Sequence, residues 1–309
     1  MKYPIQNIEN VLELTQYDGG KFKVHSLKEA EQFCKSLAVG HYENFPVGSI
    51  LISSRYRNHI YNLYAFSRIA DDIADELTGL PVETRIEALV HYEKLLLDES
   101  YLDKKEGNPI FLALHQSMKE KNLPALPFQK LLIAFKRDIV FKQANNFEDL
   151  EDYCSYSANP VGEVVLRIFD LYNEATAKLS DNVCTGLQLV NFWQDLSRDI
   201  KINRYYIPSE ILARYGLEKD NLQDEKKSAI FMECLKDIYD YTEKYFVSGK
   251  SLIKYLDNFR FRMEMKATIN GGLFIQSRLR KLGTDIINIR PKLTTGDLIK
   301  IFFKTLIDK

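Results

Sequence analysis

Four acidic residues fall within six positions of an otherwise apolar stretch, residues 67–76, "SRIADDIADE". They are Asp71, Asp72, Asp75 and Glu76. On a helix, positions 68, 71, 72 and 75 share one face, so three of these carboxylates and Arg68 would form a single polar stripe. Like charges at this spacing repel, and a bound cation would relieve that repulsion. A solvated acidic face with Arg68 as an ordinary ion pair explains the stretch equally well, so it leaves both interpretations open.

A second polar stripe lies more than a hundred residues further on, in residues 188–208, "QLVNFWQDLSRDIKINRYYIP". Asn191, Asp195 and Asp199 are spaced i, i+4 and i+8, and the rest of that helix is apolar. Two such stripes can face each other across a helical bundle, which is how bundles commonly build metal sites. The pair therefore favours a metal site over two unrelated acidic surfaces.

The expected metal is Mg²⁺, because both stripes offer only carboxylate and amide oxygens and no histidine. The five histidines of the chain form no HExxH pair, which disfavours zinc. Mg²⁺ usually keeps several waters and bridges to substrate phosphates. Arg68, Arg198 and Arg204 lie close to the stripes and suit phosphate contact. The residues predict a helical cavity that binds a phosphate or diphosphate through Mg²⁺.

Aromatic residues are frequent, with 18 Phe and 18 Tyr. Tyr64, Phe66 and Trp193 lie on or next to the two acidic helices. Such rings could line an apolar cavity and stabilise a carbocation, or they could simply fill the core. The sequence leaves the two roles open for each ring.

The elements that carry these residues are predicted to be helices, because long stretches follow the 3.6-residue period and no clear alternating strand pattern occurs. The predicted helices span residues 26–38, 45–77, 83–100, 108–121, 127–143, 148–172, 176–202, 208–214, 224–249, 251–287 and 294–307. We expect breaks near Arg55 and at Asn159-Pro160. With no low-complexity linker or repeat in 309 residues, we predict one all-α domain over 1–309 with residues 1–25 peripheral.

Composition excludes several classes of function and compartment. A net charge of −1 provides no basic field for nucleic acid. Four dispersed cysteines, the absence of a signal sequence and the absence of an apolar window long enough to span a bilayer predict a cytoplasmic protein. The amphipathic C-terminus, "LIKIFFKTLIDK", fits a helix packed on the core, although it could contact a membrane surface.

Three motifs resemble those of the squalene/phytoene synthase family, in order and in spacing. "YAFSRIADDIADE" (64–76) resembles its first aspartate-rich motif, and "NFWQDLSRDIKINRYYIP" (191–208) resembles its second. "EDYCSYSANPVGEVVLRIF" (151–169) resembles the helix pair that lies between them. The resemblance covers residues 40 to 290. It implies an isoprenoid synthase helical bundle with a central cavity, acting with Mg²⁺ on a long prenyl diphosphate.

The resemblance also implies roles for individual positions. Asp71 and Asp75 would bind Mg²⁺ from the first motif, and Asn191, Asp195 and Asp199 from the second. The residues expected to contact the substrate are Asn44, Tyr64, Arg68, Arg204 and Tyr206. Asp72 would be a supporting ligand.

Three details resemble the branch of the family that converts presqualene diphosphate into hydroxysqualene. Asn44 stands where condensing members have a phosphate-binding serine. "SANPVG" (157–162) and "NFWQD" (191–195) also depart from the pattern of condensing members. No GxGxxG fingerprint is present, so reduction of the product is expected to need a separate reductase.

Three alternatives stay open at this point. The first is a condensing synthase that joins two prenyl diphosphates into presqualene diphosphate, squalene, dehydrosqualene or phytoene. The second is an inactive helical assembly factor, which the intact sets of ligand residues disfavour. The third is a general Mg²⁺ phosphohydrolase, which the aromatic content disfavours.

Overall fold

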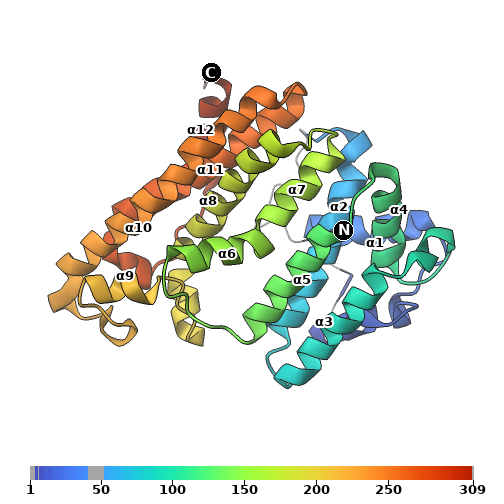
Figure 1. The fold of residues 1–309 in the computed structure, drawn as a ribbon, viewed down its shortest axis with the longest axis horizontal. Helices are drawn as coiled ribbons and strands as arrows, with labels where there is room; N and C mark the ends of the chain where they lie inside the picture. The colour runs from blue at the N-terminus through green and yellow to red at the C-terminus, as the bar shows by residue number, and fades with distance from the viewer. Residues whose placement is uncertain (1–3, 6, 41–51, 308–309) are drawn as a thin grey trace. The chain divides into compact units, whose positions relative to one another are not determined.

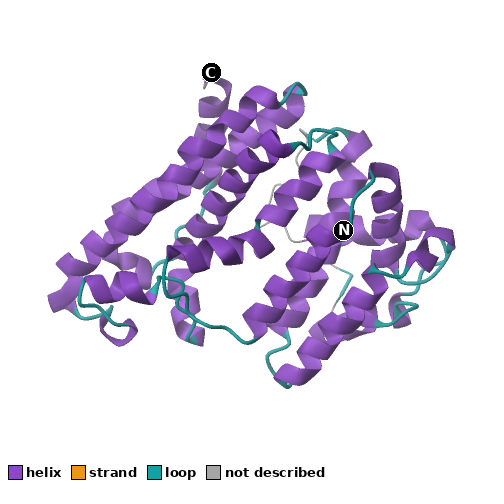
Figure 2. Cartoon of the chain, in the orientation of Figure 1, coloured by secondary structure: helices purple, strands orange, loops and turns teal. Residues whose placement is uncertain are grey.

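The computed structural model describes residues 4–5, 7–40 and 52–307, and the described residues are almost entirely helical (Figures 1 and 2). The α-helices are α1 Leu27–Gly40, α2 Ser54–Asp71, α3 Val82–Leu96, α4 Pro109–Lys121, α5 Leu126–Ile139, α6 Phe147–Ser157, α7 Asn159–Ile168, α8 Glu174–Asp199, α9 Ser209–Arg214, α10 Ser228–Gly249, α11 Phe259–Leu282 and α12 Thr295–Ile307. The described residues contain no strand, only an isolated bridge between Val24 and Gly107. None of the helices in these ranges is long and apolar enough to cross a membrane.

Short helical segments of other geometry connect or extend several α-helices. Those that matter below are η1 Ile8–Thr15, η3 Asp72–Glu76, η5 Ile200–Ile202, η8 Lys250–Tyr255 and η9 Gly283–Ile287. The segment η3 is a π-helical turn, and the others are 3-10 helices.

The chain divides into two compact units, of which unit 1 comprises Met1–Phe141 and Glu163–Tyr172. Its core is aromatic: the ring of Phe66 on α2 stacks on Tyr92 at 5.1 Å and meets Phe128 edge-on at 5.4 Å. The N-terminal segment η1 contributes fully buried Val11 and Leu14 to this unit. A segment expected to be peripheral is therefore anchored by apolar burial.

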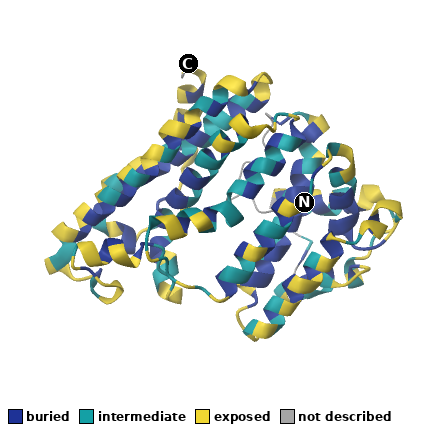
Figure 3. Cartoon of the chain, in the orientation of Figure 1, coloured by how far each residue is buried: buried dark blue, intermediate teal, exposed yellow. Residues whose placement is uncertain are grey.

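Unit 2 comprises Lys142–Gly162 and Asn173–Lys309, and its centre is α8 packed against α10 and α11. Figure 3 shows buried stripes along these helices. Two glycines allow the close approach: a Cβ at Gly272 of α11 would lie 2.8 Å from Leu187 Cδ2, and one at Gly249 of α10 would lie 2.7 Å from Val183 Cγ2. Trp193 of α8 is fully buried, and its indole N–H donates to Thr242 Oγ1 at 2.9 Å.

The predicted helices are confirmed with shifted ends. The expected break near Arg55 is the start of α2 at Ser54, and the expected break at Asn159-Pro160 is the change from α6 to α7 at Ala158. Residues 45–51 of the predicted helix 45–77 lie outside the described residues. The chain passes between the two units at three points, and the prediction of a single domain stays a prediction.

Candidate functional site

The first acidic motif lies where α2 ends and continues directly into the π-turn η3. Ile69, Ala70, Ile73 and Ala74 are fully buried in unit 1, which fixes the inward side of this segment. Asp75 is exposed, and 39% of the Asp71 side chain is accessible. π-Turns of this kind are rare and occur often at functional sites.

Asp72 differs from its acidic neighbours in burial, although Arg68 contacts both Asp71 and Asp72, as expected for residues of one stripe. Its side chain is completely buried and forms an ion pair with the guanidinium of Arg68. The same guanidinium lies 3.3 Å from Asp71 Oδ2 and 3.7 Å from Glu76 Oε1. The difference in burial follows from helix geometry, because consecutive residues point about 100° apart. Asp72 therefore binds Arg68 from inside the protein, whereas Asp71 and Asp75 keep accessible surface.

The carboxyl of Asp71 is harder to ionise than an ordinary aspartate. Desolvation by the surrounding protein raises its pKa to about 7, repulsion from Asp75 adds to the rise, and Arg68 opposes it. The carboxylate thus lies in protein on most sides while part of its surface stays accessible. A cation placed there would lower this pKa and stabilise the ionised form.

A second arginine, which the sequence pattern did not single out, supports the π-turn. Arg85 of α3 is 7% exposed, and its Nη1 donates to the carbonyl of Ala74 at 2.8 Å. The wide turn leaves this carbonyl facing the protein interior, where it needs a donor. The only available signal was a charged residue on the apolar helix "VETRIEALV", and surface arginines give the same signal.

The second motif lies on the last turns of α8 in unit 2. Asn191 is exposed, and Asp195 and Asp199 are partly exposed. The opposite side of this helix is buried, with Leu189, Trp193 and Leu196 in the core. Asn191, Asp195 and Asp199 therefore lie along the accessible side of α8, as their spacing predicted.

Arg290 is the residue of this motif that sequence reasoning missed. Its guanidinium forms an ion pair with Asp195, and the side chains are 15% and 19% exposed. One residue before Asp195, Gln194 Nε2 donates to the carbonyl of Pro291 at 2.7 Å. The loop before α12 is thus bound to the second polar stripe by two side chains. A separation of 95 residues between Asp195 and Arg290 hides this contact from pattern analysis.

The Arg-x-Tyr-x-Pro element follows η5 in a turn made by Asn203, which has a left-handed φ of 58°. The backbone N–H of Arg204 donates to the carbonyl of Asp199 at 2.8 Å, which fixes this turn to the end of α8. The ring of Tyr206 stacks on Phe192 with centroids 3.9 Å apart. Arg204 and Tyr206 are therefore placed beside the second stripe.

The remaining candidate residues fall into three groups. Phe66 and Trp193 are fully buried core residues of their own units. Tyr64 is partly exposed, and desolvation raises the pKa of its hydroxyl. Arg198 is exposed, and Asn44 lies outside the described residues.

The donor atoms of each motif suit a hard cation, although neither motif is a closed metal cage. Among the described residues, no group of three or more His, Cys, Asp or Glu side chains is arranged to hold an ion. Each half instead offers accessible oxygen donors at one helix end, and that of unit 1 carries excess negative charge around Arg68. An open, all-oxygen donor set fits Mg²⁺, which completes its shell with water and phosphate oxygens.

Comparison with known proteins identifies the family of the chain. The family model for squalene/phytoene synthases matches residues 38–297. The hydroxysqualene synthase of Sinorhizobium fredii is 34% identical over 80% of this chain and 82% of its own length. That of Rhodopseudomonas palustris is 33% identical over 72% and 74%.

Solved structures give the same result. The crystal structure of squalene synthase HpnC from Alicyclobacillus acidocaldarius superposes with a TM-score of 0.76 and 34% identity, covering 83% of this chain and 95% of that one. A dehydrosqualene synthase with 20% identity also has a TM-score of 0.76, covers 91% of this chain and 96% of its own, and shows the shared fold. The fold is thus the all-α isoprenoid synthase fold, and the chain belongs to the squalene/phytoene synthase family.

Proposed function

We propose that this protein converts presqualene diphosphate into hydroxysqualene and diphosphate in a Mg²⁺-dependent reaction. The observation that carries the proposal is the pair of relatives named hydroxysqualene synthase, which are 34% and 33% identical over 80% and 72% of the chain. The motif "NFWQD" and Asn44 in place of serine point to the same branch of the family.

In this proposal Mg²⁺ would be held by carboxylate and amide oxygens of both motifs. The residues are Asp71, Asp75, Asn191, Asp195 and Asp199. When bound, the ion supplies positive charge that stabilises the departing diphosphate. The support for this assignment is the oxygen-only donor set, together with the pKa of Asp71, which desolvation and then repulsion from Asp75 raise.

Side chains of the protein would also bind the diphosphate. Arg68 is held against Asp71 by the buried carboxylate of Asp72, so its guanidinium is oriented before substrate arrives. Arg204 and Tyr206 follow the second stripe and would contact the diphosphate oxygens. The carbon–oxygen bond breaks and its electron pair leaves with diphosphate. Water then adds to the rearranged cation and releases a proton to solvent. Reduction of the resulting alcohol would fall to a separate reductase.

A condensing synthase is the second candidate, and one observation favours it. The solved relative with 34% identity is named a squalene synthase. In this alternative the substrate is farnesyl diphosphate, two molecules of which are joined. The two candidates share the diphosphate chemistry and differ in whether the carbon–carbon bond is already made.

Product analysis distinguishes the two. The purified chain is incubated with Mg²⁺ and either presqualene diphosphate or farnesyl diphosphate, and lipid products and released diphosphate are measured. We expect hydroxysqualene from presqualene diphosphate and no turnover of farnesyl diphosphate alone. Turnover of farnesyl diphosphate would overturn the proposal in favour of condensation.

A further inference from the structure

The last helix, α12, exposes an apolar face that no described part of the chain covers. The helix packs against α11 through Asp297, Ile301 and Thr305, all of which are buried. Its large apolar side chains point the other way, with exposed fractions between 52% and 78%: Leu298, Ile299, Phe302, Phe303, Leu306 and Ile307. Single exposed apolar residues are common, but a contiguous set on one helix marks a binding surface.

The polarity of α12 is reversed relative to an ordinary surface helix. Its inward stripe contains Asp297, which forms an ion pair with Arg278 of α11 at 2.7 Å. The same stripe contains Thr305, which accepts a hydrogen bond from Asn270 Nδ2 at 3.2 Å. A helix packed only for the stability of its own domain would bury phenylalanines and expose these polar groups. The described residues therefore leave the outward face available to an apolar partner.

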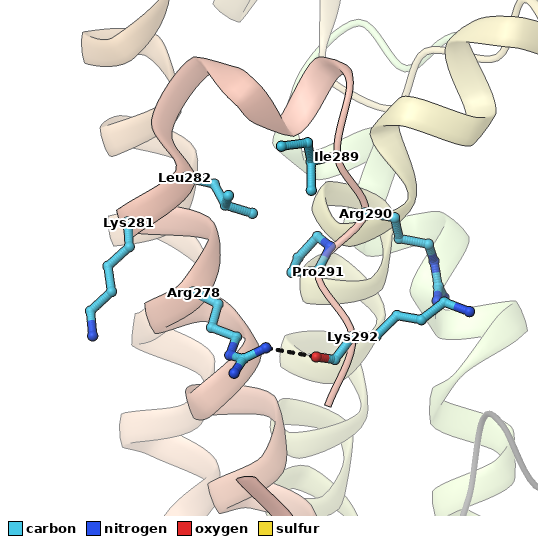
Figure 4. A pocket seen from close by; sticks show the side chains of 7 residues that line it. All are labelled: Arg278, Lys281, Leu282, Ile289, Arg290, Pro291 and Lys292. Atoms are coloured by element: carbon cyan, nitrogen blue, oxygen red, sulfur yellow. Dashed lines mark hydrogen bonds between the residues drawn. The ribbon is translucent and has the colours of Figure 1, made fainter. Parts of the chain in front are cut away.

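Positive charge lies beside the apolar face. At 100° per residue, Lys300 and Lys304 fall on one flank of it, and both are exposed. The start of α12 adjoins an open pocket of about 400 Å³ that is lined by four cations and three apolar side chains: Arg278, Lys281, Leu282, Ile289, Arg290, Pro291 and Lys292. In Figure 4, Arg278 and Lys281 come from α11, and Arg290 and Lys292 come from the loop that leads to α12. Arg278 Nη1 also donates to the carbonyl of Lys292 at 2.7 Å.

We propose that this face of α12, with its flanking lysines, binds the surface of a bilayer that contains anionic lipids. Phenylalanine and leucine on one face with lysine beside them is the composition of helices that lie in the membrane interface. With 13 residues, α12 is too short to span the hydrocarbon core and would lie along the surface. Lys281 and Lys292 of the pocket at its start would add attraction to lipid phosphates, whereas Arg278 and Arg290 already pair with carboxylates.

A second copy of the chain is a poorer partner for this face. A symmetric antiparallel contact between two such faces would put Lys300 and Lys304 of one copy on the same side as the same lysines of the other. Like charges at an interface are unfavourable, whereas an anionic bilayer neutralises them. The proposal concerns binding alone and holds whichever substrate the protein uses.

Vesicle flotation tests the proposal with the whole chain of 309 residues. We expect the protein to float with vesicles of phosphatidylcholine and phosphatidylglycerol, and less with phosphatidylcholine alone. The variant Phe302→Ser/Phe303→Ser should lose at least about tenfold in bound fraction, because apolar insertion drives such binding. Lys300→Glu/Lys304→Glu should weaken binding to the anionic vesicles and remove its dependence on salt.

The matched control is Leu126→Ser/Val140→Ser, which removes two apolar side chains of unit 1 that are 59% and 54% exposed. It should bind as the unmodified protein does, and circular dichroism checks that every variant is folded. Absence of flotation with both kinds of vesicle, or unchanged flotation of the phenylalanine variant, would overturn the proposal. So would sedimentation as a dimer that Phe302→Ser/Phe303→Ser dissociates, since the face would then be covered by a second copy.

Discussion

Neighbouring aspartates of the first motif have opposite surroundings and should respond differently to the same substitution. Asp75 is exposed, whereas Asp72 is fully buried against Arg68. Sequence spacing alone assigned them to one stripe, because it does not show which side of a helix faces the core. Substituting each aspartate separately should therefore distinguish a role in catalysis from a role in stability.

Asp75→Asn should lower kcat/KM by at least about a hundredfold, because it removes a proposed Mg²⁺ ligand. It should leave the free energy of unfolding within about 0.5 kcal/mol, since the side chain is exposed. Asp72→Asn should cost about 2–4 kcal/mol of stability, because a buried ion pair loses one charge. Turnover with Mg²⁺ and urea unfolding measure the two effects. Equal losses of activity and equal stability in both variants would contradict this division of roles.

The raised pKa of Asp71 predicts a pH-dependent loss of stability in the metal-free protein. Between about pH 4 and pH 7 the folded state keeps a proton that the unfolded state has released, so stability falls as pH rises through this window. Asp71→Asn cannot ionise and escapes this loss. At pH 8 its melting temperature should exceed that of the unmodified protein by roughly 1–3 °C, a modest shift because solvent screens the partly exposed group.

The control for this prediction is the same comparison at the acidic end of the window, near pH 4. The melting temperatures should nearly agree there, because folded Asp71 keeps its proton and the unfolded chain has released only part of its own. If Asp71→Asn were no more stable than the unmodified protein at pH 8, the ionised carboxylate of Asp71 would not destabilise the fold. The Asp71→Asn variant should be inactive at every pH, because it lacks the proposed Mg²⁺ ligand.

At the scale of elements, the sequence predicted the helices well and their fine geometry poorly. The 3.6-residue period and the breakers placed α3 and α4 within four residues of their observed ends. The π-turn was not predictable, because its carbonyl at Ala74 depends on Arg85 from another helix. Arg290 was missed for the same reason: its partner Asp195 lies 95 residues away.

The C-terminal helix illustrates another limit of periodicity. Its amphipathic pattern predicted a helix, and α12 confirms that helix. Periodicity does not tell which face turns inward, and here the stripe with Asp297 and Thr305 is the buried one. The ion pair between Asp297 and Arg278 of α11 favours the orientation in which this stripe of α12 faces inward.

Two adjacent glycines of α11 offer a matched test of how closely α8 is packed. A Cβ at Gly272 would lie 2.8 Å from Leu187 Cδ2 and 2.9 Å from Phe246 Cζ, whereas a Cβ at Gly271 meets nothing within 4 Å. Gly272→Ala should lower the free energy of unfolding by about 1–3 kcal/mol through overpacking. Gly271→Ala should raise it by up to about 1 kcal/mol, because alanine favours helix.

Urea unfolding of both variants measures this difference, and the activity of Gly272→Ala reports whether α8 has moved. Because α8 carries Asn191, Asp195 and Asp199, a displaced helix should also lower turnover. If both variants gained stability, the contact between α8 and α11 would be looser than the structure shows.

At the scale of the whole molecule, the path of the chain couples the two units. Residues 163–172 return to unit 1 after 142–162 have entered unit 2, so neither unit is a continuous segment that could fold first during synthesis. The first motif belongs to one unit and the second to the other. The proposed function therefore requires both units to be folded together.

Trp193 is the single tryptophan of the chain, and its burial in α8 makes it an optical reporter for one unit only. Its fluorescence should change when the core around Thr242 opens, whereas circular dichroism follows the helices of both units. Because the chain crosses between the units three times, we expect the two signals to give the same urea midpoint. A dichroism transition without a fluorescence change would reveal unit 1 unfolding alone. The fluorescence of Trp193, compared with the dichroism signal, therefore shows whether the units that carry the two motifs unfold as one cooperative structure.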